Sequence, residues 1–475
     1  MRAGTRLALA LALATAGCGG SVVALRQPFD STPLRLASLA QHRSAPEARS
    51  RRTTPIAHVV LVVQENRTFN DFFATFPGAD GTTKGKAKPN ARCGITKEET
   101  IPLEKMGLVT RLHGTPHDLT HTYKGYATAR DGVAMDGFDD VIFRTGGYEC
   151  MYPYQYTDPA EIKPYWQMAR QYALAEHMFT TQGSNSFTAH QDLIAADTRI
   201  GPAGALIDLP SCSGSTCVWG CDAPAGTHTS LITKDDVYQS GAGPFPCLTY
   251  PTLRNLLDAR KISWRYYVPP ICCSLYGKQF SAFDAIKAVR YSRQWSDGHI
   301  ASPQTKILDD VKAKRLAAIS WVIPDENDSD HPGSDSDTGP SWVASIVNAI
   351  GESAYWKSTA IVIVWDDWGG LYDNLKPPQY GYGGLGFRVP AIVVSAYAKP
   401  GYISKTQYEF GSILHYIEDN WHLGTLERSD KRAASIGECF DYAQKPIAFT
   451  PIASRYPTAY FLARKPSYLP VDNDL

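Results

Sequence analysis

Residues 360–373, AIVIVWDDWGGLYD, combine a strongly apolar run with an acidic end. The first six residues have no polar side on either face of an extended chain, which predicts a strand buried on both sides of a parallel sheet. The run stops at Asp366 and Asp367, which two glycines follow at positions 369 and 370. Ligands of open α/β sheets bind at the carboxyl ends of strands, and two adjacent carboxylates there repel each other unless a cation lies between them. The stretch therefore indicates either a divalent-metal site or a solvated acidic turn.

An earlier stretch, residues 56–64 (IAHVVLVVQ), shows the same pattern. It is an apolar run that ends at two further oxygen-bearing side chains, Glu65 and Asn66. Two buried strands that each deliver oxygen ligands to one edge of a sheet make the metal site the favoured interpretation.

Strand-like and helix-like segments alternate along most of the chain. Further strands are expected at residues 263–268, 316–324 and 387–396, and helices at residues 164–172, 191–196, 250–261, 283–291, 340–350 and 410–421. This alternation is typical of an α/β fold with a mostly parallel central sheet flanked by helices.

The N-terminal residues have the features of an export signal. Arg2 and Arg6 precede an apolar run at residues 7–14, which is too short to span a bilayer and fits a secretory signal peptide. Residues 15–18 (TAGC) also resemble a lipoprotein cleavage box, so Cys18 is either lipidated or lies near an ordinary cleavage site. Both alternatives predict an exported protein that is periplasmic, a lipoprotein of the outer membrane or secreted.

The predicted domain organisation has four parts. Residues 1–18 form the export signal, and residues 19–54, polar and rich in Arg, Ser and Ala, form a flexible tether. A catalytic domain is expected at residues 55–445, with an insertion at about 202–249, and residues 446–475 are expected to wrap its surface. The formal net charge of the chain is zero, so nothing favours a nucleic-acid partner or binding to an anionic membrane surface through charge.

The cysteines indicate disulfide bonds. The sequence has 10 cysteines, four of which lie in the Gly-, Ser- and Pro-rich insertion: Cys212, Cys217, Cys221 and Cys247. Their spacing could also bind zinc, but in an exported protein disulfide bonds that staple a surface insertion are favoured. Setting Cys18 aside leaves an odd number, which predicts one free thiol, and the pairing itself cannot be read from the sequence.

Two further segments carry residues suited to catalysis. His113, His117 and His121 lie within nine residues, and the i, i+4 spacing of the last two would place them on one helix face. That spacing can bind zinc, but the glutamate of a metalloprotease motif is absent between them. Residues 180–190 (TTQGSNSFTAH) form a hydroxyl-rich loop before a helix, where a nucleophile and a phosphate are both well placed. The alternative for this loop is an ordinary helix cap rich in Ser and Thr.

Together these segments resemble the bacterial phosphoesterase family, which contains phosphatidylcholine-preferring phospholipases C and a group of acid phosphatases. The resemblance extends from about His58 to Trp421. It rests on residues 65–69 (ENRTF), 135–138 (MDGF), 330–332 (DHP), 356–357 (WK) and 366–370 (DDWGG), with residues 387–390 (FRVP) and 411–414 (GSIL) as later landmarks. It implies an alkaline-phosphatase-like α/β sandwich and a metal-dependent hydrolase of phosphoric mono- or diesters.

The resemblance also implies roles for particular residues. The metal ligands would be Glu65, Asn66, Asp366 and Asp367, together with the nucleophile. In the loop the nucleophile corresponds to Ser186, with Thr188 as the alternative, and it would form a phosphoserine intermediate. His331, which lies in the very acidic segment 325–339 (DENDSDHPGSDSDTG), and His121 would contact the phosphoryl oxygens or the leaving group.

Three residues are expected to contact the substrate: His190, Asn374 and His117. The cofactor would be a divalent ion such as Ca²⁺, Mg²⁺ or Mn²⁺, and the substrate a small phosphate ester or a phospholipid head group.

Three positions depart from the family pattern. Ala189 stands where the family has Asn, Asn374 where it has His, and Phe410 where a His is often found. Asn can donate a hydrogen bond to a phosphate oxygen but cannot transfer a proton. The alternative prediction is therefore a catalytically impaired member that binds only metal or phosphate.

Overall fold

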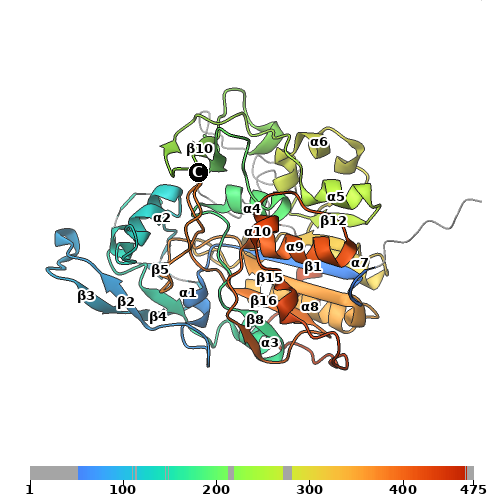
Figure 1. The fold of residues 1–475 in the computed structure, drawn as a ribbon. Helices are drawn as coiled ribbons and strands as arrows, with labels where there is room; N and C mark the ends of the chain where they lie inside the picture. The colour runs from blue at the N-terminus through green and yellow to red at the C-terminus, as the bar shows by residue number, and fades with distance from the viewer. Residues whose placement is uncertain are drawn as a thin grey trace, which may run out of the picture. The chain divides into compact units, whose positions relative to one another are not determined.

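An eight-stranded sheet forms the centre of the fold, with the strand order β13-β12-β14-β1-β15-β16-β8-β17 (Figure 1). The structure is a computed structural model that describes residues 52–109, 111–112, 115–144, 146–147, 149–211, 219–270, 281–465 and 467. The strands are β1 (His58–Gln64), β8 (Ala173–Ala175), β12 (Trp264–Tyr267), β13 (Ile300–Ala301), β14 (Ile319–Val322), β15 (Thr359–Trp365), β16 (Ala391–Ser395) and β17 (Tyr402–Ser404).

The sheet is mostly parallel, as predicted. Strand β1 lies between β14 and β15 and is parallel to both. Strand β16 runs antiparallel to β15 and to β8, while β8 and β17 are parallel. Every residue of β15 is buried, because helices cover both faces of the sheet. The α/β prediction and the two leading strands are therefore confirmed.

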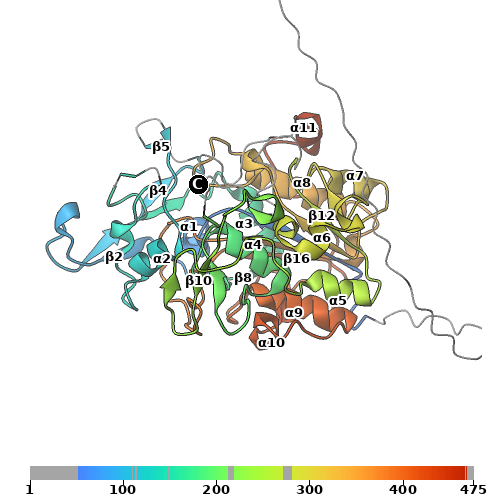
Figure 2. The same cartoon turned by 90° about the horizontal axis from the view of Figure 1, so that it is seen from above.

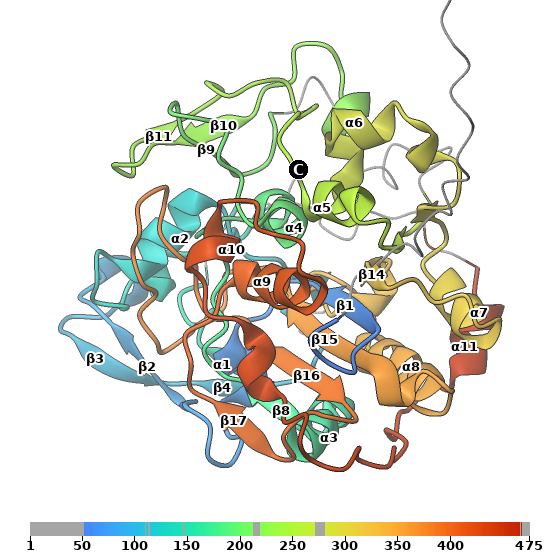
Figure 3. The same cartoon turned by 45° about the vertical axis from the view of Figure 1, so that its right-hand side comes forward.

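Helices cover the two faces of this sheet in separate groups (Figures 2 and 3). One face carries α4 (Ser186–Ala195), α5 (Leu253–Ala259) and α9 (Phe410–Trp421), and the other carries α3 (Lys163–Gln171), α7 (Lys306–Lys312) and α8 (Gly339–Gly351). The observed α9 matches the range expected from the sequence, since a capping box of Glu409 and Ser412 fixes its start.

Shorter elements complete the described residues. The helices are α1 (Phe69–Phe73), α2 (Tyr123–Arg130), α6 (Lys287–Arg290), α10 (Ser429–Arg432) and α11 (Thr458–Ala463). The strands are β2 (Lys84–Ala87), β3 (Glu99–Pro102), β4 (Glu104–Met106), β5 (Arg111–Leu112), β6 (Thr115–Pro116) and β7 (Gln155–Thr157). No helix in the described ranges has both the length and the apolar character needed to cross a bilayer.

The predicted insertion contains a small sheet of its own. Strands β9 (Ala205–Ile207), β10 (Ser230–Ile232) and β11 (Tyr238–Gln239) pair antiparallel, and a disulfide joins Cys221 to Cys247. A second disulfide, Cys93–Cys150, lies outside the insertion, and of the described cysteines Cys439 is free and buried. The described residues do not include Cys18, Cys212, Cys217, Cys272 or Cys273, nor His113 and the predicted export signal.

One sequence prediction about local structure is wrong. His117 and His121 do not share a helix face, because residues 117–121 form no helix and Leu119 forms an isolated β-bridge to Phe143. Helix α2 begins only at Tyr123, where the side chain of Thr122 accepts a hydrogen bond from the backbone N–H of Gly125. The cap is therefore Thr122, and the histidine spacing reflects no helical periodicity.

A buried acid on α9 predicts a pH-dependent stability. Burial, together with the neighbouring Asp430, raises the pKa of Glu418 to about 9. The folded state therefore binds a proton that the unfolded chain releases, so the contribution of Glu418 to stability is lost as the pH rises from 4.5 toward 9. We expect Glu418→Gln to raise the Tm by at least about 2 °C at pH 8, and much less at pH 4.5.

The exposed Asp419 on the same helix provides the matched control, Asp419→Asn. Thermal unfolding followed across this pH range would contradict the assignment if Glu418→Gln and Asp419→Asn changed the Tm equally.

Candidate active site

The site forms where two paired strands end at the same edge of the sheet. Strands β1 and β15 are parallel and in register, with Gln64 opposite Trp365. The chain continues from them into Glu65 and Asp366, and the backbone N–H of Asp366 donates to the carbonyl of Gln64 at 2.9 Å. The two acidic ends that the sequence places about 300 residues apart therefore lie together.

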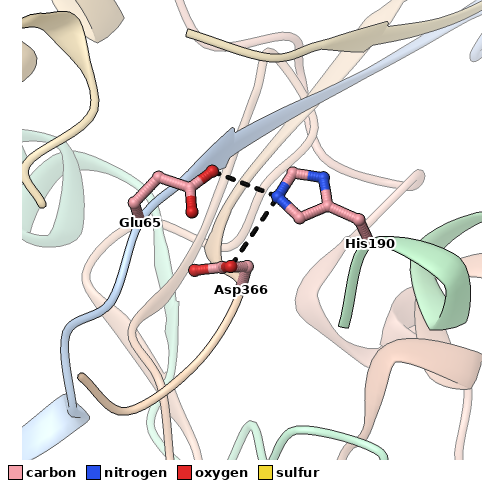
Figure 4. Close-up of side chains that lie close together, drawn as sticks. All are labelled: Glu65, His190 and Asp366. Carbon is pink, nitrogen blue, oxygen red and sulfur yellow. Dashed lines mark hydrogen bonds and ion pairs between the residues drawn. The ribbon is translucent and has the colours of Figure 1, made fainter. Parts of the chain in front are cut away.

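Two of these acids form a compact cluster with a histidine (Figure 4). His190 Nε2 lies 3.1 Å from Glu65 Oε1 and 3.7 Å from Asp366 Oδ2. One ligand atom from each of the three residues falls within 4.8 Å of the others, and all three side chains are buried. Burial raises the pKa of Asp366 well above its usual range, and the nearby Glu65 carboxylate raises it further.

This cluster fits a divalent cation. Asp366 Oδ2 is buried and has no hydrogen-bond partner in the described residues, and two carboxylates in a dry site are unfavourable unless a positive charge lies between them. Glu65, Asp366 and His190 can all reach one ion. His190 was expected to bind substrate, whereas its position beside Glu65 and Asp366 favours a metal ligand. Its i, i+4 relation to Ser186 in α4 is the sequence signal that could have placed both on one helix face.

The remaining predicted residues gather next to this cluster. The hydroxyl of Ser186 lies 3.1 Å from Asp367 Oδ2 and 3.3 Å from Asn66 Oδ1, and either oxygen can accept its hydrogen. His121 Nε2 is 3.8 Å from Asp367 Oδ2. All of these side chains are buried. The structure thus brings Ser186, Asn66, Asp367 and His121 together beside Glu65, Asp366 and His190.

The side-chain amide of Asn66 lies between the two histidines, His121 and His331, and the carboxylate of Asp366. Its Nδ2 is 3.1 Å from His121 Nε2 and 3.0 Å from His331 Nε2. With the amide oxygen and nitrogen exchanged, the nitrogen instead donates to Asp366 Oδ1 at 2.9 Å and the oxygen accepts from the two histidines. The exchanged orientation satisfies both amide atoms, because in the first one the oxygen faces the carboxylate oxygens of Glu65 and Asp366. It turns the nitrogen toward these carboxylates, so the hydrogen bonds do not favour Asn66 as a metal ligand.

The tautomers of the two histidines depend on their backbone contacts. His121 Nδ1 donates to the carbonyl of Leu119 at 2.8 Å, which leaves Nε2 of the neutral ring as an acceptor. His331 Nδ1 accepts from the N–H of Gly333 at 3.1 Å, which places the hydrogen of the neutral ring on Nε2. The two rings therefore present opposite functions toward Asn66, one accepting and one donating.

Asp118 is a residue that sequence reasoning did not assign to the site. Its carboxylate lies 3.9 Å from His121 Nδ1 and 4.0 Å from His331 Nε2. Neither oxygen has a hydrogen-bond partner in the described residues. Its carboxylate therefore lies beside both histidines of the site.

The backbone around Ser186 and Asn66 is also specialised. Ser186 is the first residue of α4, whose N-terminal N–H groups favour an anion. Asn66 has a φ of 59°, a left-handed conformation that Asn tolerates better than most residues. A Cβ atom at Gly369 would lie 2.2 Å from the Asn66 carbonyl oxygen, so the glycine after the two aspartates is required for this close approach.

Thr188, the alternative nucleophile, is turned away from the cluster. Its hydroxyl donates to the carbonyl of Asn185 at 3.0 Å, within the first turn of α4. The geometry therefore favours Ser186.

Two predicted substrate-binding residues lie outside this group. Asn374 accepts a hydrogen bond from Arg388 Nη2 at 2.6 Å, and Arg388 in turn forms a buried ion pair with Asp373 at 3.0 Å. The ring of His117 packs against Phe143, with 4.7 Å between the ring centroids. Neither side chain has a contact with the Ser186 cluster among the interactions of the described residues, and both were proposed from sequence position alone.

The position of Asn374 leads to a test by substitution. We expect Asn374→Ala to leave kcat/KM within about twofold and to cost about 1 kcal/mol of stability, because one hydrogen bond to Arg388 is lost. Steady-state kinetics and thermal unfolding of this variant check both values. A loss of turnover without a loss of stability would instead return Asn374 to the substrate site.

Comparisons with known proteins find a family model and curated relatives. A model of the Phosphoesterase family matches residues 56–424. "Phospholipase C A" of Mycobacterium tuberculosis is 23% identical over 465 residues, which cover 88% of this chain and 83% of that protein. "Non-hemolytic phospholipase C" of Pseudomonas aeruginosa is 24% identical over 442 residues, covering 81% of this chain and 56% of that protein.

The solved structures that match this chain are distant in sequence and in structure. A protein of the alkaline phosphatase superfamily from Vibrio parahaemolyticus has a TM-score of 0.34 and 11% identity, covering 58% of this chain and 65% of its own. A sulfatase from Pseudoalteromonas sp. has a TM-score of 0.33 and 10% identity, covering 84% of this chain and 74% of its own.

Proposed function

Because the chain belongs to the Phosphoesterase family and is a hydrolase acting on phosphoester bonds, we propose that it is metal-dependent and uses Ser186 as its nucleophile. The observation that carries the proposal is the position of the Ser186 hydroxyl, 3.1 Å from Asp367 and beside the Glu65–Asp366–His190 cluster. Nucleophile, anion-binding helix start and cation ligands then meet at one point, which is what phosphoryl transfer requires.

In this proposal each residue has a defined task. Asp367 accepts the hydroxyl hydrogen of Ser186 and orients the oxygen for attack on phosphorus. The free N–H groups at the start of α4 bind the phosphoryl oxygens. Attack forms a bond from Ser186 Oγ to phosphorus and breaks the bond to the leaving oxygen, giving a phosphoserine that water then hydrolyses.

His121 and His331 are positioned to transfer protons. His331 carries a hydrogen on Nε2 in its neutral form and His121 accepts at the same atom. One can therefore donate to a leaving oxygen while the other accepts from water.

The cation ligands narrow the choice of metal. A bound divalent ion supplies positive charge that stabilises the serine alkoxide and the phosphoryl oxygens. Glu65, Asp366 and His190 would hold it. An imidazole ligand suits Zn²⁺, Mn²⁺ or Fe²⁺ better than Ca²⁺ or Mg²⁺, which prefer oxygen.

The substrate class follows from the family. The relatives named phospholipase C support a phospholipid head group or a small phosphate ester as the substrate. Export, with or without a lipid on Cys18, stays part of this proposal, since a phospholipase requires access to a membrane.

The departures from the family pattern do not favour an impaired enzyme. Phe410 is fully buried in the apolar core, and Asn374 is bound to Arg388. Ala189 lies within the first turn of α4, where its N–H donates to the carbonyl of Asn185. None of the three substitutions removes a side chain that the Ser186 cluster uses.

The test is hydrolysis by metal-stripped protein refilled with one divalent ion at a time. p-Nitrophenyl phosphate, p-nitrophenyl phosphorylcholine and phosphatidylcholine vesicles distinguish a monoesterase from a phospholipase C. We expect turnover to return with a transition-metal ion. Absence of turnover of every ester with every ion would overturn the proposal and favour a protein that only binds metal or phosphate.

A further inference from the structure

The acidic segment that carries His331 is held by an arginine from the C-terminal part of the chain. Arg464 Nη2 donates to both carboxyl oxygens of Asp325 and to Asp328 Oδ2, each at 2.7 Å. Asp325 and Asp328 are fully buried, whereas the side chain of Arg464 is 19% exposed. The negative charge of Asp325 and Asp328, at the start of the acidic segment, is thus balanced by Arg464.

Two carboxylates this close are unfavourable without Arg464. Burial raises the pKa of Asp328 well above its usual range, and the neighbouring Asp325 raises it further, while Arg464 opposes both effects. Removing one partner of a buried ion pair leaves an uncompensated charge. Without Arg464 the segment must therefore take up a proton or open toward water.

The acidic segment is hydrogen-bonded directly to β1, the strand that leads into Glu65. Gln64 Nε2 donates to the Asp328 carbonyl at 2.8 Å and to Asp330 Oδ2 at 3.1 Å. The backbone N–H of Glu65 donates to the Ser329 carbonyl at 2.8 Å. A displacement of Asp328 is consequently passed to Gln64, the residue that precedes Glu65.

The backbone between Asp328 and His331 is held by several hydrogen bonds. Asp330 has a φ of 70°, which is strained for a residue other than glycine. Its carboxylate accepts from the Tyr165 hydroxyl at 2.6 Å, and its carbonyl accepts from Arg67 Nε at 2.8 Å. The next residue is His331, whose N–H donates to the side chain of Ser329 at 3.2 Å.

We propose that Arg464 is a positioning residue that holds His331 in place for phosphoryl transfer. This inference rests on the proposed function. Arg464 contacts no reacting group. It acts by fixing Asp325 and Asp328 at the start of the acidic segment, a few residues before His331.

The rest of the C-terminal segment anchors Arg464. Helix α11 lies beside α8 (Figure 3), with 5.5 Å between the ring centroids of Phe461 and Trp342. Before α11, the hydroxyl of Tyr456 donates to Asp337 at 2.8 Å, and Arg455 pairs with the same carboxylate. The side chain of Arg455 is 73% exposed, so this second pair contributes little.

The test compares Arg464→Gln with Arg455→Gln, a matched control from the same segment. With p-nitrophenyl phosphate and the metal that supports turnover, we expect Arg464→Gln to lower kcat by about tenfold or more, because small displacements of catalytic groups are costly. We expect Arg455→Gln to stay within about twofold, because an exposed pair matters little. Arg464→Lys keeps one charge, and we expect it to retain more kcat than Arg464→Gln. Arg464→Lys also serves as the folded variant if Arg464→Gln does not accumulate.

A double-substitution cycle separates positioning from general destabilisation. In a His331→Gln background we expect Arg464→Gln to lower kcat by less than about twofold, since residues that act through one another are not additive. Losses that multiply, or a wild-type kcat in Arg464→Gln, overturn the positioning role while leaving the proposed function intact.

A readout without turnover keeps the two proposals distinguishable. The ring ¹³Cε1–¹H NMR signal of His331, assigned by its loss in His331→Gln, should shift in Arg464→Gln and stay unchanged in Arg455→Gln. An inactive wild-type protein defeats the proposed function. An unshifted His331 signal defeats the positioning role.

Discussion

Ser186→Ala is expected to lower kcat by at least about 10⁴-fold, since removing the nucleophile of a hydrolase costs that much or more. The reason is geometric: the Ser186 hydroxyl is 3.1 Å from Asp367 and 3.3 Å from Asn66, at the start of α4. The variant should keep its fold, because alanine is a favourable helix residue. Metal binding should persist, because Glu65, Asp366 and His190 are untouched. The measurements are steady-state hydrolysis of p-nitrophenyl phosphate and metal binding by calorimetry.

Thr188→Ala is the matched control for this prediction. The Thr188 hydroxyl donates to the Asn185 carbonyl inside α4, so its removal should change kcat by less than about threefold and cost at most about 1 kcal/mol of stability. The reverse pattern, an active Ser186→Ala beside an inactive Thr188→Ala, would make Thr188 the nucleophile.

Asp366→Asn is expected to abolish turnover and to weaken metal binding by more than about 100-fold. This loss exceeds the typical effect of substituting a residue that only hydrogen-bonds to a metal ligand. The same substitution should stabilise the metal-free protein by about 1 kcal/mol or more, because it removes a buried charge that Glu65 repels. Loading with metal should raise the Tm of the wild-type protein and leave that of Asp366→Asn unchanged.

Asp373→Asn provides a control of opposite sign on the same strand-end segment. Burial raises the pKa of Asp373 as well, but its carboxylate is paired with Arg388 at 3.0 Å, so its neutralisation leaves a buried guanidinium without its partner. That substitution should destabilise the protein by about 3–5 kcal/mol with or without metal. Thermal unfolding of both variants, metal-free and loaded, checks the signs. A metal-free Asp366→Asn that is less stable than wild type would contradict the repulsion argument.

The sequence allowed the sheet to be predicted where strands are buried on both faces. Strands β1 and β15 are continuous apolar runs, and such runs leave little choice of structure or burial. Their polar ends identified Glu65, Asn66, Asp366 and Asp367, since parallel neighbours end at one edge. Ser186 was assigned through the family resemblance, because the hydroxyl-rich loop alone left an ordinary helix cap as the alternative. Only the strand-end acids depend on local pattern alone.

The errors involve contacts between distant parts of the chain. The spacing of His117 and His121 suggested a helix, but the segment forms none, and Leu119 forms a β-bridge to Phe143 instead. Asn374 was assigned to the substrate through the family resemblance; its side chain accepts a hydrogen bond from Arg388, and its contact with substrate stays a prediction. No local pattern shows that Arg464 meets Asp325 and Asp328. These outcomes depend on which elements meet in the folded protein.

The place of β1 in the sheet has a consequence for synthesis of the chain. Strand β1 is made early, yet its neighbours β14 and β15 follow roughly 250 and 300 residues later, on the order of ten to sixty seconds at about 5–20 residues per second. During that interval both edges of an apolar strand are open to wrong partners. Glu65 and Asp366 cannot meet until β15 has emerged. The incomplete chain is therefore prone to aggregation, and it cannot hydrolyse phosphoesters because its site is not assembled. A chaperone that shields β1 should raise the yield of active protein.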